Sequence, residues 1–432
     1  MRITTHLARR SAYAAALAIL VTGVASVPAL AASTTPTTLA PNDGVGGDLF
    51  GESTATSANG AVTAVGSPEH NGSGAVYVFT GAGAAATQTA ELTPSNPQFD
   101  EQFGQTVAIS GDGLTLVAAA PAAAGGGASD EGAAFVFTNT GGTWTQTATL
   151  SVPGTSLLGT SLAISTDAST IVLGAPTSNN DNGEAFVFTK SGSTYVQTQE
   201  LTEPTTATSA AKVLTQAGSA AKRKPKPGPT PPPPALLGTD TAISANGSTI
   251  AFAEPNVGVT DVFTKAVGAS TWTQTAQLHG GADSVAVSAD GTIIAAGQPG
   301  INNLNGAVFV FKESGGTFTE ASEVLPPANT SGAADGAGFN IGMSADGSII
   351  AFGAPTATAG TAFESGQVFV ATETSTGTWT LTATDNEPNP VSDDDFGGGD
   401  QSVSVVGDGS AIVAGARDAN GQTGQALVFP AS

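Results

Sequence analysis

One unit of sequence recurs seven times along the chain, and this repeat limits the possible fold more than any other feature. Its clearest part is a four-residue turn, typically Ser-x-Asp-Gly, between two short apolar runs. The seven turns span residues 57–60, 110–113, 165–168, 244–247, 288–291, 344–347 and 406–409. Once one insertion is removed the period is about 53 residues, which suits four short strands. The repeat therefore predicts an all-β fold, a seven-bladed β-propeller of four-stranded blades.

The order of strands within a unit follows from its residue types. Asp-Gly or Asn-Gly between alternating apolar runs favours a tight hairpin, expected here as a type I′ turn joining strands A and B. Strand B should end at a proline such as Pro121, because proline has no N–H to extend the ladder. Strand C carries alternating aromatic residues such as Phe135 and Phe137, and strand D opens with a tryptophan such as Trp144. These aromatic side chains are expected in the core between neighbouring blades.

The seventh unit stops after strand C and has no strand D of its own. A matching segment lies at the other end of the chain, where Thr-Thr-Leu-Ala-Pro at 37–41 resembles Ala-Glu-Leu-Thr-Pro at 90–94. An open sheet edge on the last blade would invite aggregation. We therefore predict that residues 34–41 supply the outer strand of blade 7 and close the ring.

Two segments do not follow the repeat. Residues 1–31 combine Arg2, Arg9 and Arg10 with an apolar stretch and a small-residue cleavage site after Ala31, which is typical of a signal peptide. We therefore expect a secreted, extracellular protein without a membrane span, with the propeller covering residues 32–432. Residues 205–234, between the third and fourth units, are basic and proline-rich. This composition predicts a disordered insertion that cannot join a sheet.

Composition excludes several classes of function. The chain has 35 Asp and Glu residues, 12 Lys and Arg residues and no cysteine. Disulfides and thiolate metal sites are therefore impossible, and an acidic body is repelled by nucleic acids and anionic membranes. Beyond the predicted signal peptide only His70 and His279 remain, so no Ser-His-Asp arrangement can be argued. We expect no enzymatic activity, no nucleic-acid partner and no cofactor.

The topology assigns the candidate binding residues to one face of the ring. The B–C loops and the D–A connections lie on the same face and vary between units, whereas the A–B and C–D turns are short and uniform. The candidates are the acidic residues of this loop face: Asp48, Asp100, Glu101, Asp130, Glu131, Asp335, Asp393, Asp394 and Asp395. Each carboxylate could bond backbone N–H groups at its own turn, or all could form a rim that attracts cationic groups.

Three dipeptides connect this repeat to a known family. Phe50-Gly51, Phe103-Gly104 and Phe396-Gly397 are each followed by Gly-Ser-Pro, Ala-Ala-Pro or Gly-Ala-Arg. They resemble FG-GAP repeats, the units of the integrin α-subunit β-propeller. The resemblance implies a monomeric adhesion or binding module that recognises an extracellular protein or surface ligand, including cationic ones. A carbohydrate-binding propeller is the alternative, and a carboxylate-based glycan-active enzyme is a more distant one.

The family also carries a calcium loop in some blades, between the FG and GAP elements. That loop has the form Asp-x-Asx-x-Asp-Gly-x-x-Asp, whereas this chain has only the short four-residue turns there. A calcium site needs six or more oxygen ligands, which one such turn cannot supply. No metal site is therefore expected from the resemblance.

Overall fold

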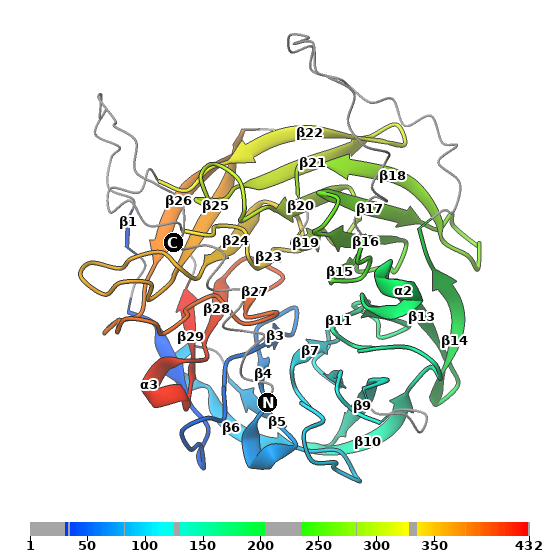
Figure 1. The fold of residues 1–432 in the computed structure, drawn as a ribbon, viewed down its shortest axis with the longest axis horizontal. Helices are drawn as coiled ribbons and strands as arrows, with labels where there is room; N and C mark the ends of the chain where they lie inside the picture. Colours follow the sequence, from blue (N-terminus) through cyan, green and yellow to red (C-terminus); the bar gives the residue numbers. More distant parts are fainter. Residues whose placement is uncertain are drawn as a thin grey trace, which may run out of the picture.

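Seven antiparallel sheets form a ring in the computed structural model of the chain (Figure 1). The structure describes residues 31–32, 35–81, 83–124, 130–203, 235–281, 283–327, 335–375 and 377–430. The prediction of an all-β, seven-bladed propeller is confirmed. Apart from Ala31, the predicted signal peptide lies outside the described residues, and so does the predicted insertion at 205–234. No helix in the described ranges is long and apolar enough to cross a membrane.

Each blade runs from strand A at the central channel to strand D at the rim. Blades 1 to 3 contain β3 (Thr54–Thr56), β4 (Val62–Ser67), β5 (Ala75–Thr80), β6 (Thr87–Leu92), β7 (Thr106–Ile109), β8 (Thr115–Ala120), β9 (Ala133–Thr140), β10 (Thr143–Leu150), β11 (Ser161–Ile164), β12 (Thr170–Ala175), β13 (Glu184–Ser191) and β14 (Thr194–Leu201). Blades 4 to 6 contain β15 (Asp240–Ile243), β16 (Thr249–Glu254), β17 (Val259–Thr264), β18 (Thr273–His279), β19 (Ser284–Val287), β20 (Ile293–Gly297), β21 (Val308–Ser314), β22 (Thr317–Val324), β23 (Ile341–Met343), β24 (Ile349–Ala354), β25 (Gln367–Ser375) and β26 (Thr378–Asp385).

Blade 7 is built from both ends of the chain. It contains β27 (Val403–Val405), β28 (Ala411–Ala416) and β29 (Gln425–Pro430), and its outer strand is β2 (Thr37–Leu39). β2 pairs antiparallel with β29, and the Leu39 side chain is buried beside Phe50. In Figure 1 the blue start of the chain accordingly meets the red last blade. The predicted closure of the ring is confirmed.

The remaining elements are short. β1 (Ala31–Ala32) pairs parallel with β26 at the rim of blade 6. The helical turns are α2 (Ser178–Asp181), α3 (Ala419–Gln422), η1 (His70–Gly72) and η2 (Gly83–Ala85). Of these, η1, α2 and α3 lie in the B–C loops of blades 1, 3 and 7, so the loop face carries nearly all the helical structure of the described residues.

The A–B turns differ from the predicted type I′ hairpin. In blade 2 the Gly113 N–H donates to the Ser110 carbonyl at 2.9 Å, and Gly113 has a φ of 70° whereas Asp112 has no positive φ. The turn is held instead by the buried Ser110 hydroxyl, which donates to Asp112 Oδ1 (2.6 Å) and accepts from Thr115 N (3.0 Å). The same Ser-to-Asp or Ser-to-Asn bond recurs in blades 1, 3, 4, 5 and 6. The type I′ prediction was wrong because this side-chain bond fixes the loop with only one left-handed residue.

Neighbouring blades bury their side chains against one another in seven seams, each a cluster of hydrophobic residues shared by two adjacent sheets. In the seam between blades 1 and 2, the Phe103 ring meets the rings of Phe135 and Phe137 edge-on, with centroids 5.6 and 5.9 Å apart. Trp272 is buried and donates its Nε1–H to the Gly247 carbonyl at 3.0 Å. The predicted structural role of the repeat aromatics is confirmed for these residues.

Candidate functional site

Four of the nine predicted acidic residues share one buried repeat position. Asp48, Glu101, Asp335 and Asp394 each lie two residues before the first residue of an FG-type dipeptide, and each is at most 5% exposed. Asp48 Oδ2 accepts a hydrogen bond from Val45 N (2.8 Å), and Asp394 Oδ2 accepts one from Val391 N (2.6 Å). Burial raises the pKa of Glu101, which also accepts a backbone N–H bond three residues back. These carboxylates fold the D–A connections, as in the local-turn alternative.

The other five acidic candidates are dispersed over the loop face. Asp100 and Asp393 are exposed, at φ values of 70° and 67°, and Asp130 is partly exposed. Glu131 is 9% exposed and accepts from Gly154 N at 3.2 Å, and Asp395 forms an ion pair with an arginine. The structure therefore distributes the nine carboxylates over the B–C loops and D–A connections of several blades, and they do not form one cluster.

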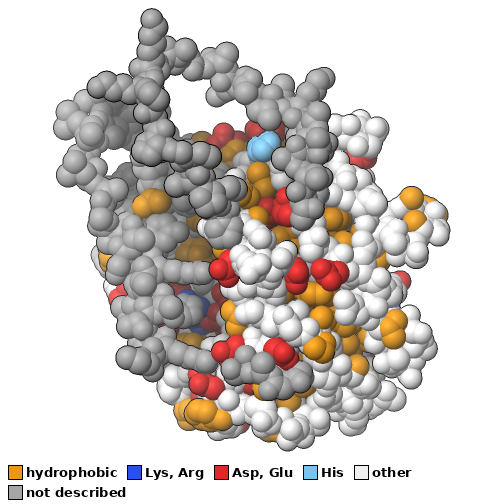
Figure 2. Space-filling model, turned by 45° about the vertical axis from the view of Figure 1, so that its right-hand side comes forward, with side chains coloured by type: hydrophobic (Ala, Val, Ile, Leu, Met, Phe, Trp, Pro, Cys, Tyr) orange, Lys and Arg blue, Asp and Glu red, His pale blue; other side chains and the backbone are white. Residues whose placement is uncertain are grey.

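Exposed hydrophobic side chains gather on this same face. Among the described residues ten large hydrophobic side chains are exposed, and seven of them lie in B–C loops or D–A connections: Val45, Phe99, Val257, Leu325, Phe339, Phe363 and Val391. Phe99 is the most exposed of the seven, at 84%. The view in Figure 2 shows acidic and hydrophobic side chains interspersed on the described surface, with few basic ones. Sequence reasoning missed this concentration, although apolar residues within polar connections were the signal.

One of these side chains, Val391, lines a hollow between the D–A connection that enters blade 7 and the B–C loop of that blade. The hollow has a volume of about 440 Å³, and its lining includes Val391, Asp393, Asp394, Asp418, Asn420 and Gln422. Phe363 N donates to Ser392 Oγ at 3.1 Å, which holds Phe363 near Val391. The connection that carries Val45 is tied to the same place, because Gly47 N donates to the Gln422 carbonyl at 3.0 Å. We call Val45, Phe363 and Val391 the apolar loop patch.

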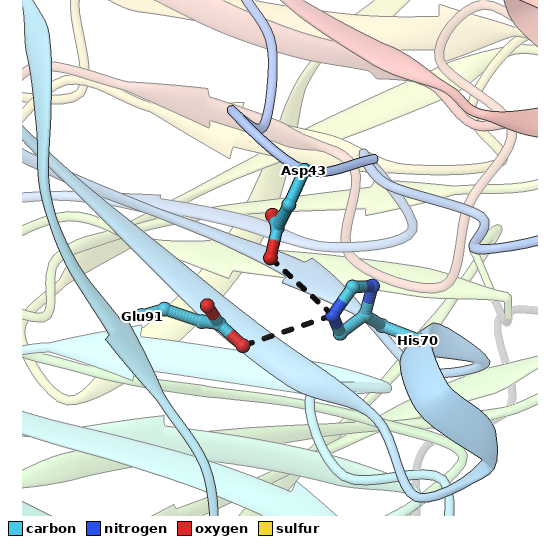
Figure 3. A group of neighbouring side chains, drawn as sticks. All are labelled: Asp43, His70 and Glu91. Atoms are coloured by element: carbon cyan, nitrogen blue, oxygen red, sulfur yellow. Dashed lines mark ion pairs between the residues drawn. The ribbon is translucent and has the colours of Figure 1, made fainter. Parts of the chain in front are cut away.

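A buried histidine stands next to this region (Figure 3). The His70 side chain is 4% exposed, and its Nδ1 lies 2.9 Å from Asp48 Oδ2. Its Nε2 lies 3.8 Å from Asp43 Oδ2 and 3.7 Å from Glu91 Oε1, as the dashed lines show. Tyr77 donates to Asp43 Oδ1 at 2.9 Å, and burial raises the pKa of Tyr77. The group joins the segment after β2 to blade 1 and so fastens the closure of the ring.

This histidine group is one of two in the described chain whose ligand atoms are close enough to share a metal ion. One imidazole and two carboxylates would suit a transition metal, but two of the three residues already have other hydrogen-bond partners. Nε2 of His70 lies 2.8 Å from Asn71 Nδ2, and Asp43 accepts from Tyr77. The second group is Glu203, Glu254 and Asp261, between blades 3 and 4.

An arginine forms ion pairs with two acidic residues where blade 7 meets blade 1. Arg417 takes the place of the proline that follows strand B in the other six blades. Its Nη1 lies 2.9 Å from both Glu52 carboxylate oxygens, and its Nη2 lies 2.8 Å from Asp395 Oδ2. Burial raises the pKa of Glu52 to about 7, against the opposing charge of Arg417. With both partners bound, this guanidinium serves the structure rather than a ligand.

The central channel is lined by the A strands and is crossed at one end. Its cavity has a volume of about 250 Å³. Gln401 of blade 7 donates to the Leu162 carbonyl in blade 3 (3.3 Å) and to Asp240 Oδ1 in blade 4 (3.2 Å). Burial raises the pKa of Asp240 to about 6. The bridging Gln401 side chain braces opposite sides of the ring.

Comparison with known proteins agrees with this architecture. The ring and its loop face define a seven-bladed β-propeller. Residues 34–79 and 86–137 match the family model described as FG-GAP repeat, so the chain carries FG-GAP repeats and the predicted resemblance is confirmed. No curated protein matches the chain.

Two solved structures align with this chain at low sequence identity. A proposed 6-phosphogluconolactonase from Bacteroides uniformis ATCC 8492 is 13% identical, with a TM-score of 0.50, over 79% of this chain and 85% of that one. A protein from Lactobacillus plantarum is 14% identical, with a TM-score of 0.49 and the same coverage of both chains. Identities this low relate folds and not activities.

Proposed function

We propose that the protein is a secreted, non-enzymatic binding or adhesion module that holds its ligand on the loop face, centred on the apolar loop patch. The observation that carries this proposal is the asymmetry of the surface, because seven of the ten large hydrophobic side chains exposed in the described ranges lie on this one face. Clustered apolar side chains rimmed by polar ones are typical of interaction sites. The rigid ring of sheets beneath holds the loops in place.

The distribution of charged side chains limits which ligands the loop face can attract. In the described ranges, Lys190 and Lys312 lie in C strands and Lys265 directly follows one. Lys265 lies over the Trp272 ring, 3.9 Å from its centroid, and Arg417 is held by two carboxylates. The described part of the loop face therefore offers acids and apolar groups and favours a basic protein or a cationic surface. A phosphorylated lactone would be repelled there, so we do not extend the Bacteroides protein's named activity to this chain.

A carbohydrate ligand is the second candidate. Phe99 is 84% exposed and Phe363 is 52% exposed, so their rings are open to stacking on a sugar face. The fully buried Trp272 and Trp379 cannot contribute. We rank this candidate second because two separate phenylalanines offer less stacking area than the tryptophans usual in sugar sites.

The proposal is tested by binding of the secreted protein to an array of basic proteins and glycans. We expect saturable binding to basic proteins that weakens at least about tenfold in the double variant Phe363→Ser, Val391→Ser. The matched control is Val267→Ser, which changes an exposed valine in the C–D turn of blade 4. Unchanged binding by the double variant would overturn the proposed site. Binding to glycans alone would favour the second candidate, and absence of any saturable binding would overturn both.

Secretion has its own test. The full chain should be released by an exporting host with Ala32 as its first residue, which N-terminal sequencing of the secreted protein would show. Retention of residues 1–31 on the purified protein would contradict a cleaved signal.

A further inference from the structure

Three carboxylates meet inside the seam between blades 3 and 4. Glu254 ends β16, Asp261 lies in β17, and Glu203 follows β14 of the preceding blade. One oxygen from each lies within 4.8 Å of the other two. Glu254 and Asp261 are both 0% exposed, on the same side of the sheet as Phe252, which packs into this seam. We call these three residues the carboxylate cluster.

The carboxylate cluster lacks the partners that buried acids need. Both Oε atoms of Glu254 and Oε1 of Glu203 are buried without a hydrogen-bond partner. Asp261, in contrast, accepts from Gln274 Nε2 (2.6 Å) and Gln277 Nε2 (3.0 Å). None of the ion pairs formed by the described residues includes a member of the cluster. Unpaired buried carboxylates are strongly disfavoured, so the seam needs protons or a cation to compensate them.

The repeat shows that these acids are departures from the common pattern. The residue equivalent to Glu254 at the end of strand B is alanine in four other blades: Ala120, Ala175, Ala354 and Ala416. The residue equivalent to Asp261 in strand C is aromatic in five others: Tyr77, Phe135, Phe186, Phe309 and Phe369. Blade 4 thus replaces a small core residue and an aromatic one by two acids on the same side of its sheet. The sheet itself requires neither acid, because the other blades form without them.

We propose that Glu203, Glu254 and Asp261 bind one divalent, oxygen-preferring cation in the seam between blades 3 and 4. Three carboxylates provide up to six oxygen ligands and no nitrogen or sulfur, which is the donor set that Ca²⁺, Mg²⁺ and Mn²⁺ prefer. Such a cation offsets two of the three buried negative charges and ties the end of the last strand of blade 3 to the inner strands of blade 4. The expectation of no metal rested chiefly on the A–B turns, and this site lies elsewhere in the repeat.

Metal binding should depend on protonation of the same oxygens. Burial, together with the neighbouring carboxylates, raises the pKa of Glu254 and of Asp261. A cation must displace the protons held by these groups, so its affinity increases with pH. This behaviour separates a built cation site from weak counter-ion binding at exposed acids, whose ordinary pKa values leave them ionised throughout the neutral range.

The test uses the mature full-length protein, stripped with chelator and titrated calorimetrically with Ca²⁺, Mg²⁺ and Mn²⁺ in turn. We expect one cation per chain for at least one of the three metals, a melting temperature raised by several degrees, and affinity at least about tenfold weaker at pH 5 than at pH 8. The double variant Glu254→Gln, Asp261→Asn should lose at least about a hundredfold in affinity. The matched control is Glu101→Gln, which changes a buried acid of blade 2 that also has an unpartnered oxygen.

Three results would overturn the proposal. They are an absence of binding by the wild type, equal affinity in the double variant, and equal loss in the control. Should the double variant fail to fold, the pH dependence of the wild-type affinity decides, because binding that does not weaken at pH 5 excludes ligands with raised pKa values. The ligand array described for the loop face is independent of this outcome, since the carboxylate cluster lies in a different seam.

Discussion

The seam between blades 7 and 1 and the seam between blades 3 and 4 solve the same electrostatic problem in different ways. Where blade 7 meets blade 1, Glu52 and Asp395 are paired with Arg417 at 2.8 to 2.9 Å. In the other seam, Glu203 and Glu254 have oxygens without partners, and no described arginine or lysine pairs with them. In the first seam the counter-charge is a residue of the chain, Arg417. In the second seam it must come from the solvent, as protons or a cation.

The difference teaches that the same framework can compensate a group of buried acids in two ways, by an arginine of its own or by protons or a cation from the solvent. Strand packing is equivalent in the two places, because Leu39 and Leu201 are each 2% exposed in the corresponding hydrophobic clusters. The two seams differ in their polar groups and not in their hydrophobic framework. Each can therefore be perturbed by a matched pair of substitutions.

Removing the internal counter-charge should have the largest effect. Arg417→Met leaves Glu52 and Asp395 buried without a cation and should lower the free energy of unfolding by about 3–5 kcal/mol. Chemical denaturation measures this change. Lys312→Met is the control, because its ion pair with Glu373 spans 3.7 Å and is partly exposed. The control should cost less than about 1 kcal/mol, and an equally small loss for Arg417→Met would show that the first seam does not depend on its arginine.

Shortening the leucine of the closing strand should have the next largest effect. Leu39→Ala and Leu201→Ala remove equivalent buried side chains from the two seams and should each cost about 2–4 kcal/mol. Equal losses are expected because Leu39 in β2 is buried as fully as Leu201 in β14, which directly follows strand C of its own blade. Thermal and chemical denaturation of the two variants check this. A negligible loss for Leu39→Ala alone would mean that the N-terminal strand does not hold the ring closed.

The smallest effect per measured step is expected in the pH dependence of stability, measured on protein kept free of metal by a chelator. Glu254 has a raised pKa when folded, so it keeps its proton at pH values where the unfolded chain has lost it. Its stabilising contribution is therefore complete below about pH 4.5 and is lost as the pH rises towards the folded value. The free energy of unfolding should fall by up to about 1.4 kcal/mol per pH unit more steeply in the wild type than in Glu254→Gln.

Besides the carboxylate cluster, the titratable groups on the strands of blades 3 and 4 are Glu184, Lys190, Tyr195, Glu200, Asp240 and His279, and all six are retained in both proteins of this comparison. Saturating divalent cation should flatten the wild-type slope and leave the variant unchanged. Parallel slopes with chelator present would show that the carboxylate cluster does not hold protons in the folded state. Chemical denaturation at a series of pH values supplies the measurement.

Much of the fold could be predicted from sequence because each blade is specified locally. Turn residues fix the A–B hairpins, apolar alternation fixes the strands, and the match of residues 37–41 to 90–94 located the closing strand that β2 confirms. The turn type was predicted wrongly, because the Ser110 hydroxyl replaces the second left-handed residue. Such a bond depends on a side-chain rotamer, which the dipeptide pattern does not show.

The sequence by itself determined the repeat, the number of blades and the sign of the surface charge, because these depend on residue types at neighbouring positions. The tertiary structure alone decided which acids are buried together. Glu203 and Asp261 are 58 residues apart in sequence, and Glu52 and Arg417 lie at opposite ends of the chain, 365 residues apart. Electrostatic energy depends on distance through space and on exclusion of water, and both are set only when the ring closes and the blades pack.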